Sequence, residues 1–526
     1  MKILFILLIL LNVKIMANSF DTSEFGKIPI VYRGRVVPFD TFARVISKQL
    51  AQNIGLAGKD PVKFCLQFFD TSIQLKDIKA FSIKSSILQN RLDISDNKRL
   101  YSQKELFSMP AFIQFSNYYN QKSKAERKEQ ADLKAYSKLA NNFKFILDLV
   151  SGKVLFMFPM DREKTNWLNL PSLYQEKTKK SIEALDYFSK LLIALRDKNQ
   201  INFNKSSLNL KNFIYLNSKG IDENKLDLEI NYNHFEPFSL SYFIYIFTLL
   251  LFIVTRNKNY WYLPLMTGFL GFTFTTLGLL SRSFILARPP LANVFESIIF
   301  ASWICVLSAH LLFYKKEKQN FYIISIFTAL LILSSKFLLP ISEDLLNLEV
   351  VLRSNLWLGL HVCFVVSSFA ILSVSSVLSH YYLFLSSKKL AIPDSLIFYI
   401  HNNIKMGVFL LGVGTVLGGI WANSTWGRFW GWDPKETWVL ITLIVYMILL
   451  HCKRMSWLSD YIVALASILS FLFILITWYG VNFIIGTGLH SYGFGTGDIK
   501  LAILFVLFEL LFITSMQRKR MSLIHA

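Results

Sequence analysis

The residue types most suggestive of chemistry in this 526-residue chain lie in one tryptophan-rich segment. Five of the 11 tryptophans fall in this segment, residues 421–438, namely Trp421, Trp426, Trp430, Trp432 and Trp438. Tryptophan favours the headgroup level of a membrane, but such a belt places only one or two indoles at the end of each span. Indole rings stack on flat apolar surfaces, and the glycines among them let a backbone approach closely. The segment therefore favours a binding surface for a large planar apolar ligand.

Charged residues in the same segment suggest two further roles. Arg428 and Lys435 could meet anionic groups such as carboxylates. Asp433 is followed by Pro434 and Glu436, a pattern typical of a helix start with aspartate as the N-cap and proline as the first helical residue. We therefore expect a structural role for Asp433, and its position in the segment also makes it a candidate ligand contact.

The elements that must position this segment are membrane helices. With 53% hydrophobic residues the chain is not an ordinary soluble protein, and from Phe238 onward it is a series of long apolar runs. Each run is near the roughly 20 residues that a hydrocarbon layer of ~30 Å needs. The sequence predicts a polytopic α-helical membrane protein with nine spans, at residues 238–255, 261–281, 293–313, 321–340, 357–385, 405–423, 436–452, 460–480 and 498–516.

The first part of the chain has the character of a soluble domain. Residues 20–236 carry most of the acidic residues, so we expect a mixed, mainly helical domain over residues 19–236, a transmembrane domain over 237–518 and a tail over 519–526. Residues 28–38 predict two strands around a turn at Gly34. Residues 1–18 favour a signal peptide over an uncleaved anchor, so the soluble domain is predicted to be extracytoplasmic.

The formal charge of +21 does not indicate nucleic-acid binding, because of where the charges lie. In the second half of the chain, basic residues cluster in short loops between apolar runs, as orientation in a lipid bilayer requires. The bias predicts a cytoplasmic C-terminus and places the tryptophan-rich segment on the outer face. The four cysteines form no C-x-x-C pair, which predicts no disulfide framework and no iron–sulfur site.

Three stretches of the sequence resemble one known family. The string W-G-R-F-W-G-W-D-P-K-E-T-W, residues 426–438, closely resembles the WWD signature of the haem-handling proteins of cytochrome c biogenesis, which include CcsA, CcmC and CcmF. Residues 287–296 and 354–362 also resemble CcsA proteins, and the resemblance covers most of residues 240–516. Residues 28–236 look more weakly like the extracytoplasmic segment of extended CcsA proteins. The resemblance implies a protein of the bacterial cytoplasmic (inner) membrane.

The resemblance gives the histidines candidate roles. The chain has eight, at positions 234, 310, 361, 380, 401, 451, 490 and 525. His361 and His490 are expected on the outer side, one before and one after the tryptophan-rich segment. Each alone is typical of an interfacial polar residue, but together they flank the indoles. In CcsA proteins the matching histidines are the two external axial ligands of haem iron, and neutral imidazole suits that metal.

A third histidine has a weaker match. His451, beside Lys453 and Arg454 at the cytoplasmic end of the seventh predicted span, is typical of a helix end that contacts anionic lipid. It also matches the family's intramembrane haem ligand, whose partner ligand comes from a CcsB (ResB) subunit. We expect a separate CcsB-type subunit to supply that ligand, and the alternative is substitution by His310 or His380.

The implied function is haem delivery with covalent attachment. Haem b would pass to the outer face, and its vinyl groups would become thioether-linked to the C-x-x-C-H motif of apocytochrome c. The chain would then be a cytochrome c haem lyase acting with a CcsB/ResB-type subunit. The alternatives are a CcmC-like haem carrier without ligation activity, a structural assembly factor and a secondary transporter. Four glycines, at positions 412, 414, 418 and 419, suggest an interrupted sixth span, which is a feature of transporters. A transporter is disfavoured because no acidic residue lies at mid-span with a matching repeat.

Overall fold

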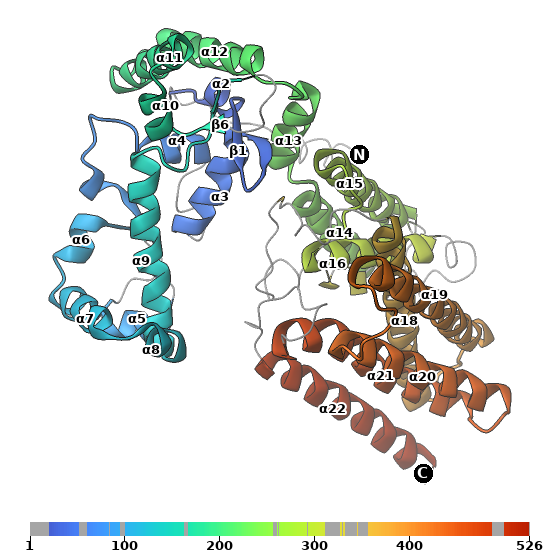
Figure 1. Ribbon diagram of the computed structural model, residues 1–526. Coiled ribbons are helices and arrows are strands. Elements are labelled where there is room, and N and C mark those ends of the chain that lie inside the picture. Colours follow the sequence, from blue (N-terminus) through green and yellow to red (C-terminus); the bar gives the residue numbers. More distant parts are fainter. Residues whose placement is uncertain are drawn as a thin grey trace. The chain divides into compact units, whose positions relative to one another are not determined.

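The computed structural model describes residues 20–51, 60–83, 85–94, 100–161, 167–255, 260, 262–291, 293–310, 324, 327–328, 330–331, 345, 356–485 and 499–524. The chain divides into two compact units, Met1–His234 (unit 1) and Phe235–Ala526 (unit 2). Both are mainly helical (Figure 1). Each unit is described by itself below.

Unit 1 combines helices with three short antiparallel strand pairs. Strand β1 (Pro29–Tyr32) pairs with β2 (Arg35–Pro38), and Gly34 between them has a φ of +80°. The predicted turn at Gly34 is therefore confirmed, because a glycine adopts this left-handed conformation without a Cβ clash. The other strands are β3 (Lys79–Phe81), β4 (Tyr101–Ser102), β5 (Phe158–Pro159) and β6 (Trp167–Leu168).

Helices build most of unit 1 around one apolar core. They are α2 (Ser23–Gly26), α3 (Phe39–Ala51), α4 (Pro61–Leu66), η1 (Leu75–Asp77), α5 (Ser86–Arg91), α6 (Gln103–Phe107), α7 (Pro110–Gln121), α8 (Lys124–Glu129), α9 (Ala131–Val150), α10 (Leu170–Glu176), α11 (Lys179–Arg196), α12 (Gln200–Asn217) and α13 (Glu223–Phe235). The N-termini of several of these helices carry capping side chains. Ser102 and Ser123, for example, each form a capping box with the glutamate three residues later.

Polar side chains join the end of unit 1 to its beginning. Arg35 donates two hydrogen bonds of 2.6 Å to the buried Glu229 of α13, and Thr41 donates a third to the same carboxylate. Nearby, Asp40 of α3 faces Arg44 and His234. Burial opposes ionisation of Asp40, but hydrogen bonds from His234 and Arg44 outweigh it, so the pKa of this carboxyl lies below its usual value. These contacts fix α13 against residues almost 200 positions earlier.

Unit 2 is a bundle of long apolar helices. It contains α14 (Pro237–Thr255), α15 (Tyr262–Leu286), α16 (Val294–Ser308), α18 (Leu356–Ser387), α19 (Asp394–Trp426), α20 (Pro434–Arg454), α21 (Asp460–Leu475), the π-helix η4 (Ile476–Ile485) and α22 (Ile499–Ile524). Within the described ranges, six helical stretches are long and apolar enough to cross a membrane: 223–255, 262–286, 356–387, 394–426, 434–454 and 460–485. The chain is therefore a polytopic helical membrane protein.

These six stretches overlap six of the nine predicted spans. Helix α16 overlaps the predicted third span, although it is shorter, and α22 covers the predicted ninth. Most of the predicted fourth span, residues 321–340, lies outside the described residues. Nine spans therefore remain a prediction.

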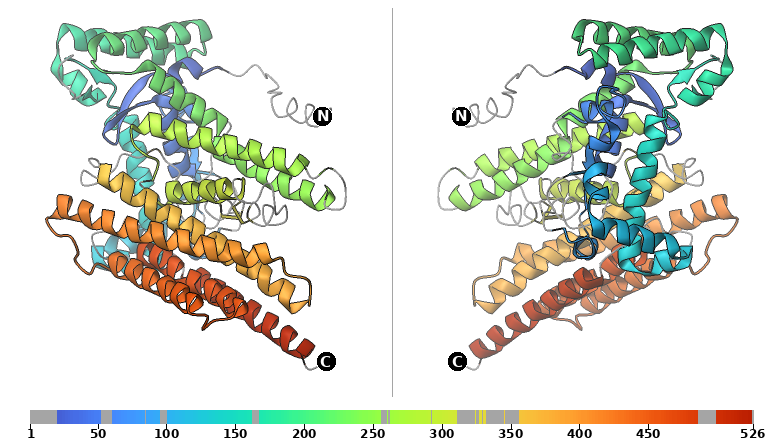
Figure 2. Two further views of the ribbon diagram at one scale, coloured as in Figure 1. Left: turned by 90° about the vertical axis from the view of Figure 1, so that its right-hand side faces the viewer. Right: turned by 90° about the vertical axis from the view of Figure 1, so that its left-hand side faces the viewer.

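The predicted interruption of the sixth span by glycine is wrong. Helix α19 continues through all four glycines, from Asp394 to Trp426, and lies beside α18 along much of its length (Figure 2). Three of the four glycines, Gly414, Gly418 and Gly419, instead make room for neighbouring residues. A Cβ on Gly418 would lie 2.6 Å from Cε1 of His361, and a Cβ on Gly419 would overlap the ring of Phe429. Glycine weakens a helix by ~1 kcal/mol relative to alanine, but here its small size permits the packing.

Candidate functional site

His361 lies in the second turn of α18 and faces α19. Its Nδ1 is 2.7 Å from the backbone carbonyl oxygen of Gly414. A carbonyl can only accept, so Nδ1 must carry the proton when the ring is neutral. That tautomer leaves the lone pair on Nε2, the atom that a metal would take. The backbone of α19 therefore prepares His361 for metal ligation through Nε2.

A cavity of about 550 Å³ lies beside His361. This size falls within the ~300–1,000 Å³ typical of ligand pockets. Apolar side chains from α16, α18 and α20 form much of its wall. Its polar and aromatic lining includes Arg288, Asn293, His361, Trp421, Phe429, Trp430, Lys435, Glu436, Trp478 and Asn482. The cavity thus offers a mostly apolar volume with few polar groups, as a large planar ligand requires.

Two of the five predicted tryptophans reach this cavity. Trp421 is buried and its ring is nearly parallel to that of His361, at an interplanar angle of 8° and a centroid distance of 6.3 Å. Trp430 also lines the cavity and meets Trp432 edge-on. Trp426 packs against Trp421, Trp438 packs against Phe473, and Trp432 is 70% exposed. The structure therefore brings Trp421 and Trp430 to the cavity and leaves the other three outside its lining.

The connection that carries Trp430 is shorter than the sequence suggested. The predicted spans 405–423 and 436–452 leave residues 424–435 between them, but α19 runs to Trp426 and α20 begins at Pro434, so only residues 427–433 connect the helices. Gly427 ends α19 with a φ of +70°, the left-handed conformation common at helix C-termini. The predicted helix start is confirmed: Asp433 is the N-cap of α20 and Pro434 its first residue.

The carboxylate of Glu436 holds this connection in shape. It accepts hydrogen bonds from the backbone N–H groups of Gly431, at 2.8 Å, and Asp433, at 3.3 Å. It also pairs with Arg428 at 3.5 Å, and the Arg428 guanidinium lies 5.8 Å from the ring centroid of Trp426. Arg428, predicted to meet ligand, therefore contacts Trp426 at the end of α19 and Glu436 in α20, and it does not line the cavity.

Lys435, in the first turn of α20, does line the cavity. Its Nζ donates to Oδ1 of Asn482 at 3.1 Å, and Nδ2 of Asn482 donates to the Trp478 carbonyl at 2.7 Å. Asn482 and Trp478 belong to the π-helix η4, a rare geometry that occurs often at functional sites. The sequence reasoning missed both residues, although a lone asparagine in an apolar run was an available signal.

A second missed group lies where α15 connects to α16. The buried Glu296 accepts hydrogen bonds from Arg282 at 2.8 Å and from Arg288 at 2.8 Å. Asn293 caps α16 by accepting from the Glu296 N–H. Arg288 lines the cavity, which the sequence reasoning did not foresee. Its signal was present in residues 287–296, a stretch already notable for its two prolines and its charges.

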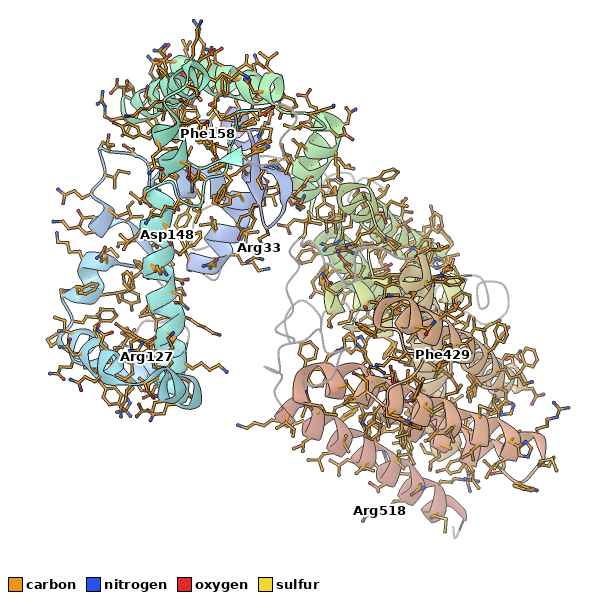
Figure 3. All side chains as sticks on the ribbon, in the orientation of Figure 1. Arg33, Arg127, Asp148, Phe158, Phe429 and Arg518 are labelled. Atoms are coloured by element: carbon orange, nitrogen blue, oxygen red, sulfur yellow. The ribbon has the colours of Figure 1, made fainter. Side chains whose placement is uncertain are left out.

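Phe429 is a third missed residue. Its ring, labelled in Figure 3, lies in the connection between α19 and α20 and contacts Gly419. It lines the cavity, although half of its surface is exposed. The adjacent pair Gly418–Gly419 was the signal, because one glycine admits His361 and the next admits Phe429.

The other candidate histidines lie in different surroundings. His451 is exposed near the end of α20 and meets Trp457 edge-on. His380 is bonded at both nitrogens, through Nδ1 to the Ser376 carbonyl and through Nε2 to Glu509, both at 2.8 Å. His310 bonds the Val306 carbonyl through Nδ1. His490 lies outside the described residues, so its predicted proximity to His361 remains a prediction.

Comparison with known proteins decides the family. A family described as "Cytochrome C assembly protein" matches residues 291–490. The cytochrome c biogenesis protein CcsA of Mesostigma viride is 33% identical over 268 residues, which cover 42% of this chain and 87% of the relative. The chain belongs to the CcsA family. The CcsA protein of a Prochlorococcus marinus strain is similarly 34% identical over 272 residues, covering 45% of this chain and 86% of the relative.

The part of this chain that matches the family includes every residue of the predicted site. His361, His451, His490 and the tryptophan-rich segment all fall within residues 291–490. Membership of the CcsA family implies a role in cytochrome c biogenesis and haem handling.

A longer relative also matches unit 1. Protein NrfI of Wolinella succinogenes is 26% identical over 500 residues, which cover 88% of this chain and 53% of NrfI. This chain therefore spans about half the length of NrfI. Because 88% of this chain is more than unit 2 contains, the similarity to NrfI extends into unit 1. The chain is a CcsA protein with an N-terminal extension.

Proposed function

We propose that this CcsA protein binds haem b in the cavity beside His361 and promotes its attachment to apocytochrome c. The single observation that carries the proposal is the tautomer of His361 together with its position at the cavity. Its Nδ1 faces the Gly414 carbonyl, so its lone pair lies on Nε2, and the same ring borders an apolar cavity of about 550 Å³. A histidine prepared in this way beside an apolar volume suits the iron and the macrocycle of haem together.

In this proposal haem is the substrate, and the residues of the cavity hold it. Nε2 of His361 ligates the iron on one side, and His490 supplies the second axial ligand. Trp421, Trp430 and Trp478 supply aromatic surface for the macrocycle. Three further residues have an indirect role, because they shape the connection that carries Trp430: Trp426, Arg428 and Asp433.

The proposal includes an orientation in the bilayer. The cavity opens at the outer face of a bacterial inner membrane, unit 1 is extracytoplasmic and the C-terminus is cytoplasmic. Nine spans and a cleaved signal peptide are consistent with this topology. Haem enters from the cytoplasmic side near His451, and a CcsB/ResB-type subunit supplies the second ligand there. Engagement of both nitrogens of His380 favours such a subunit over His380 as that ligand.

The chemical step is the addition of two thiols to two vinyl groups. Each cysteine sulfur of the apocytochrome C-x-x-C-H motif forms a bond to a vinyl carbon, and its hydrogen goes to the other carbon of the same vinyl group. No external oxidant or reductant is required. The rate gain comes from holding two thiols against two vinyls in one geometry. The chain is then a cytochrome c haem lyase together with its CcsB-type partner.

A His361→Ala variant tests the proposal. The full chain is purified with its bound haem and is also co-expressed with a reporter apocytochrome. We expect loss of the haem absorption band at this site and loss of thioether-linked product, whereas His401→Ala, a change of a histidine outside the cavity lining, leaves both intact. Normal haem content and normal maturation with His361→Ala would overturn the proposal. Bound haem without any thioether product in the wild-type chain would indicate the CcmC-like carrier instead.

A further inference from the structure

Two cationic side chains from separate parts of unit 2 line the same cavity. Arg288 comes from the connection between α15 and α16, and Lys435 comes from the first turn of α20. The remaining wall is mostly apolar, and His361 lies in it. A ligand that fills this volume therefore needs a large apolar body and two anionic groups.

Arg288 is held in place by buried neighbours. Its Nη1 donates to Glu296 at 2.8 Å and to the Pro289 carbonyl at 3.0 Å, and its Nη2 lies 3.3 Å from the same carboxylate. Glu296 is in turn fixed by Arg282, whose side chain is 1% exposed, compared with 15% for Arg288. A guanidinium fixed in this way loses little further side-chain entropy when it binds a carboxylate.

Lys435 of α20 is held in a comparable way, because its Nζ donates to Oδ1 of Asn482 in η4. The negative charge that also lines the cavity, Glu436, already accepts from the N–H groups of Gly431 and Asp433 and faces Arg428. The cavity therefore presents two positioned cations, while its acidic group serves the connection between α19 and α20.

We propose that Arg288 and Lys435 bind the two propionate groups of haem and so set which edge of the macrocycle leaves the cavity. This inference rests on the proposed function. The vinyl groups of haem lie on the pyrrole rings that do not carry the propionates. Anchoring both propionates therefore turns the vinyl edge away from the two cations. Arg288 and Lys435 are thus positioning residues, which select the orientation in which thiols can reach the vinyls.

Binding of haem and of its dimethyl ester to the purified full chain tests this role. The ester keeps the iron, the macrocycle and the vinyls but removes both carboxylate charges. We expect Arg288→Gln to weaken haem binding about ten- to hundredfold, as expected for loss of a charge-assisted hydrogen bond. The wild-type chain should bind the ester more weakly by a similar factor, and Arg288→Gln should add little further loss with the ester. Lys435→Gln should behave in the same way.

Several outcomes separate the possibilities. Lys405→Gln, which changes an exposed lysine of α19 outside the cavity lining, should leave both affinities unchanged. Equal losses with haem and ester in Arg288→Gln and Lys435→Gln would show a structural effect and overturn the inference, as would no loss with haem. If Arg288→Gln does not fold, Lys435→Gln and the wild-type comparison of the two ligands decide the question. Failure of the wild-type chain to bind either ligand would instead overturn the proposed function.

Discussion

Both units bury a glutamate against arginine, but the two ion pairs serve different purposes. In unit 1, Glu229 receives Arg35 and Thr41 and joins α13 to the beginning of the domain. In unit 2, Glu296 accepts hydrogen bonds from Arg282 and Arg288, and Arg288 also lines the cavity. A buried carboxylate is costly unless it is paired. Unit 1 uses the pair to close a fold, whereas unit 2 uses it to hold a cation toward a ligand site.

The largest effects are expected when each of the two buried carboxylates is neutralised, which tests whether the two ion pairs differ in purpose. Glu229→Gln and Glu296→Gln should each destabilise the chain by about 3–5 kcal/mol, because each leaves a buried guanidinium without its charged partner. Chemical unfolding of the detergent-solubilised chain measures the loss. Only Glu296→Gln should also weaken haem binding in the protein that remains folded. Equal effects of the two changes on haem binding would remove the distinction.

A second experiment sharpens the part played by α19. Gly418→Ala places a Cβ 2.6 Å from Cε1 of His361, so the ring must move from its position beside the Gly414 carbonyl. We expect haem affinity to fall about tenfold, which corresponds to ~1.4 kcal/mol. Gly412→Ala is the matched control, because a Cβ there meets nothing within 4 Å. Titration with haem compares the two variants, and equal affinities would show that His361 needs no such placement.

A smaller effect is expected at the start of α20. Asp433→Ala removes the side chain that accepts from the Lys435 N–H and should cost ~1 kcal/mol of stability. Asp433→Asn, which preserves an N-cap acceptor, should recover most of that loss in thermal unfolding. If Asp433 instead contacts haem through its charge, Asp433→Asn will lower haem affinity as much as Asp433→Ala does.

The smallest expected effect is the pH response of unit 1. Because the pKa of Asp40 is lowered in the fold, its ionised form adds stability above its unfolded pKa, and this stability is lost as the pH falls through the folded pKa. Acidification below about pH 4 should therefore accelerate hydrogen exchange in α3 and α13. Asp40→Asn should remove part of this acid sensitivity. An identical acid response in wild type and Asp40→Asn would show that Arg44 and His234 do not stabilise the carboxylate.

Local chemistry explains what could be predicted from the sequence. The turn at Gly34 and the N-cap at Asp433 depend on a few adjacent residues, and both are present. The apolar runs predicted nine spans, and within the described ranges six helical stretches that could cross a membrane overlap six of them. The end of α19 was misjudged because Asn423, Ser424 and Thr425 suggest a loop, whereas the helix continues until Gly427 provides a left-handed C-cap. Polar residues at a helix end do not by themselves stop a helix.

The composition of the cavity could be predicted only in part. His361, Trp421 and Trp430 were recognisable from residue type and from the family signature, and all three line it. Arg288 and Asn482 were not, because their roles depend on how separate helices meet. Arg428 was the predicted cation because it is adjacent to the tryptophans in sequence. In the structure Arg428 instead pairs with Glu436, in the first turn of α20.

The partner that orients His361 is a main-chain oxygen, and this has a consequence for mutational scanning. Every amino acid placed at position 414 would still carry that oxygen. No side-chain deletion can therefore erase the acceptor, as it could if an aspartate oriented the imidazole. Disruption would have to come from bulk that separates the two helices. A scan of this region should accordingly reveal sensitivity to added volume along α19, with no second position whose truncation reproduces the loss of the histidine.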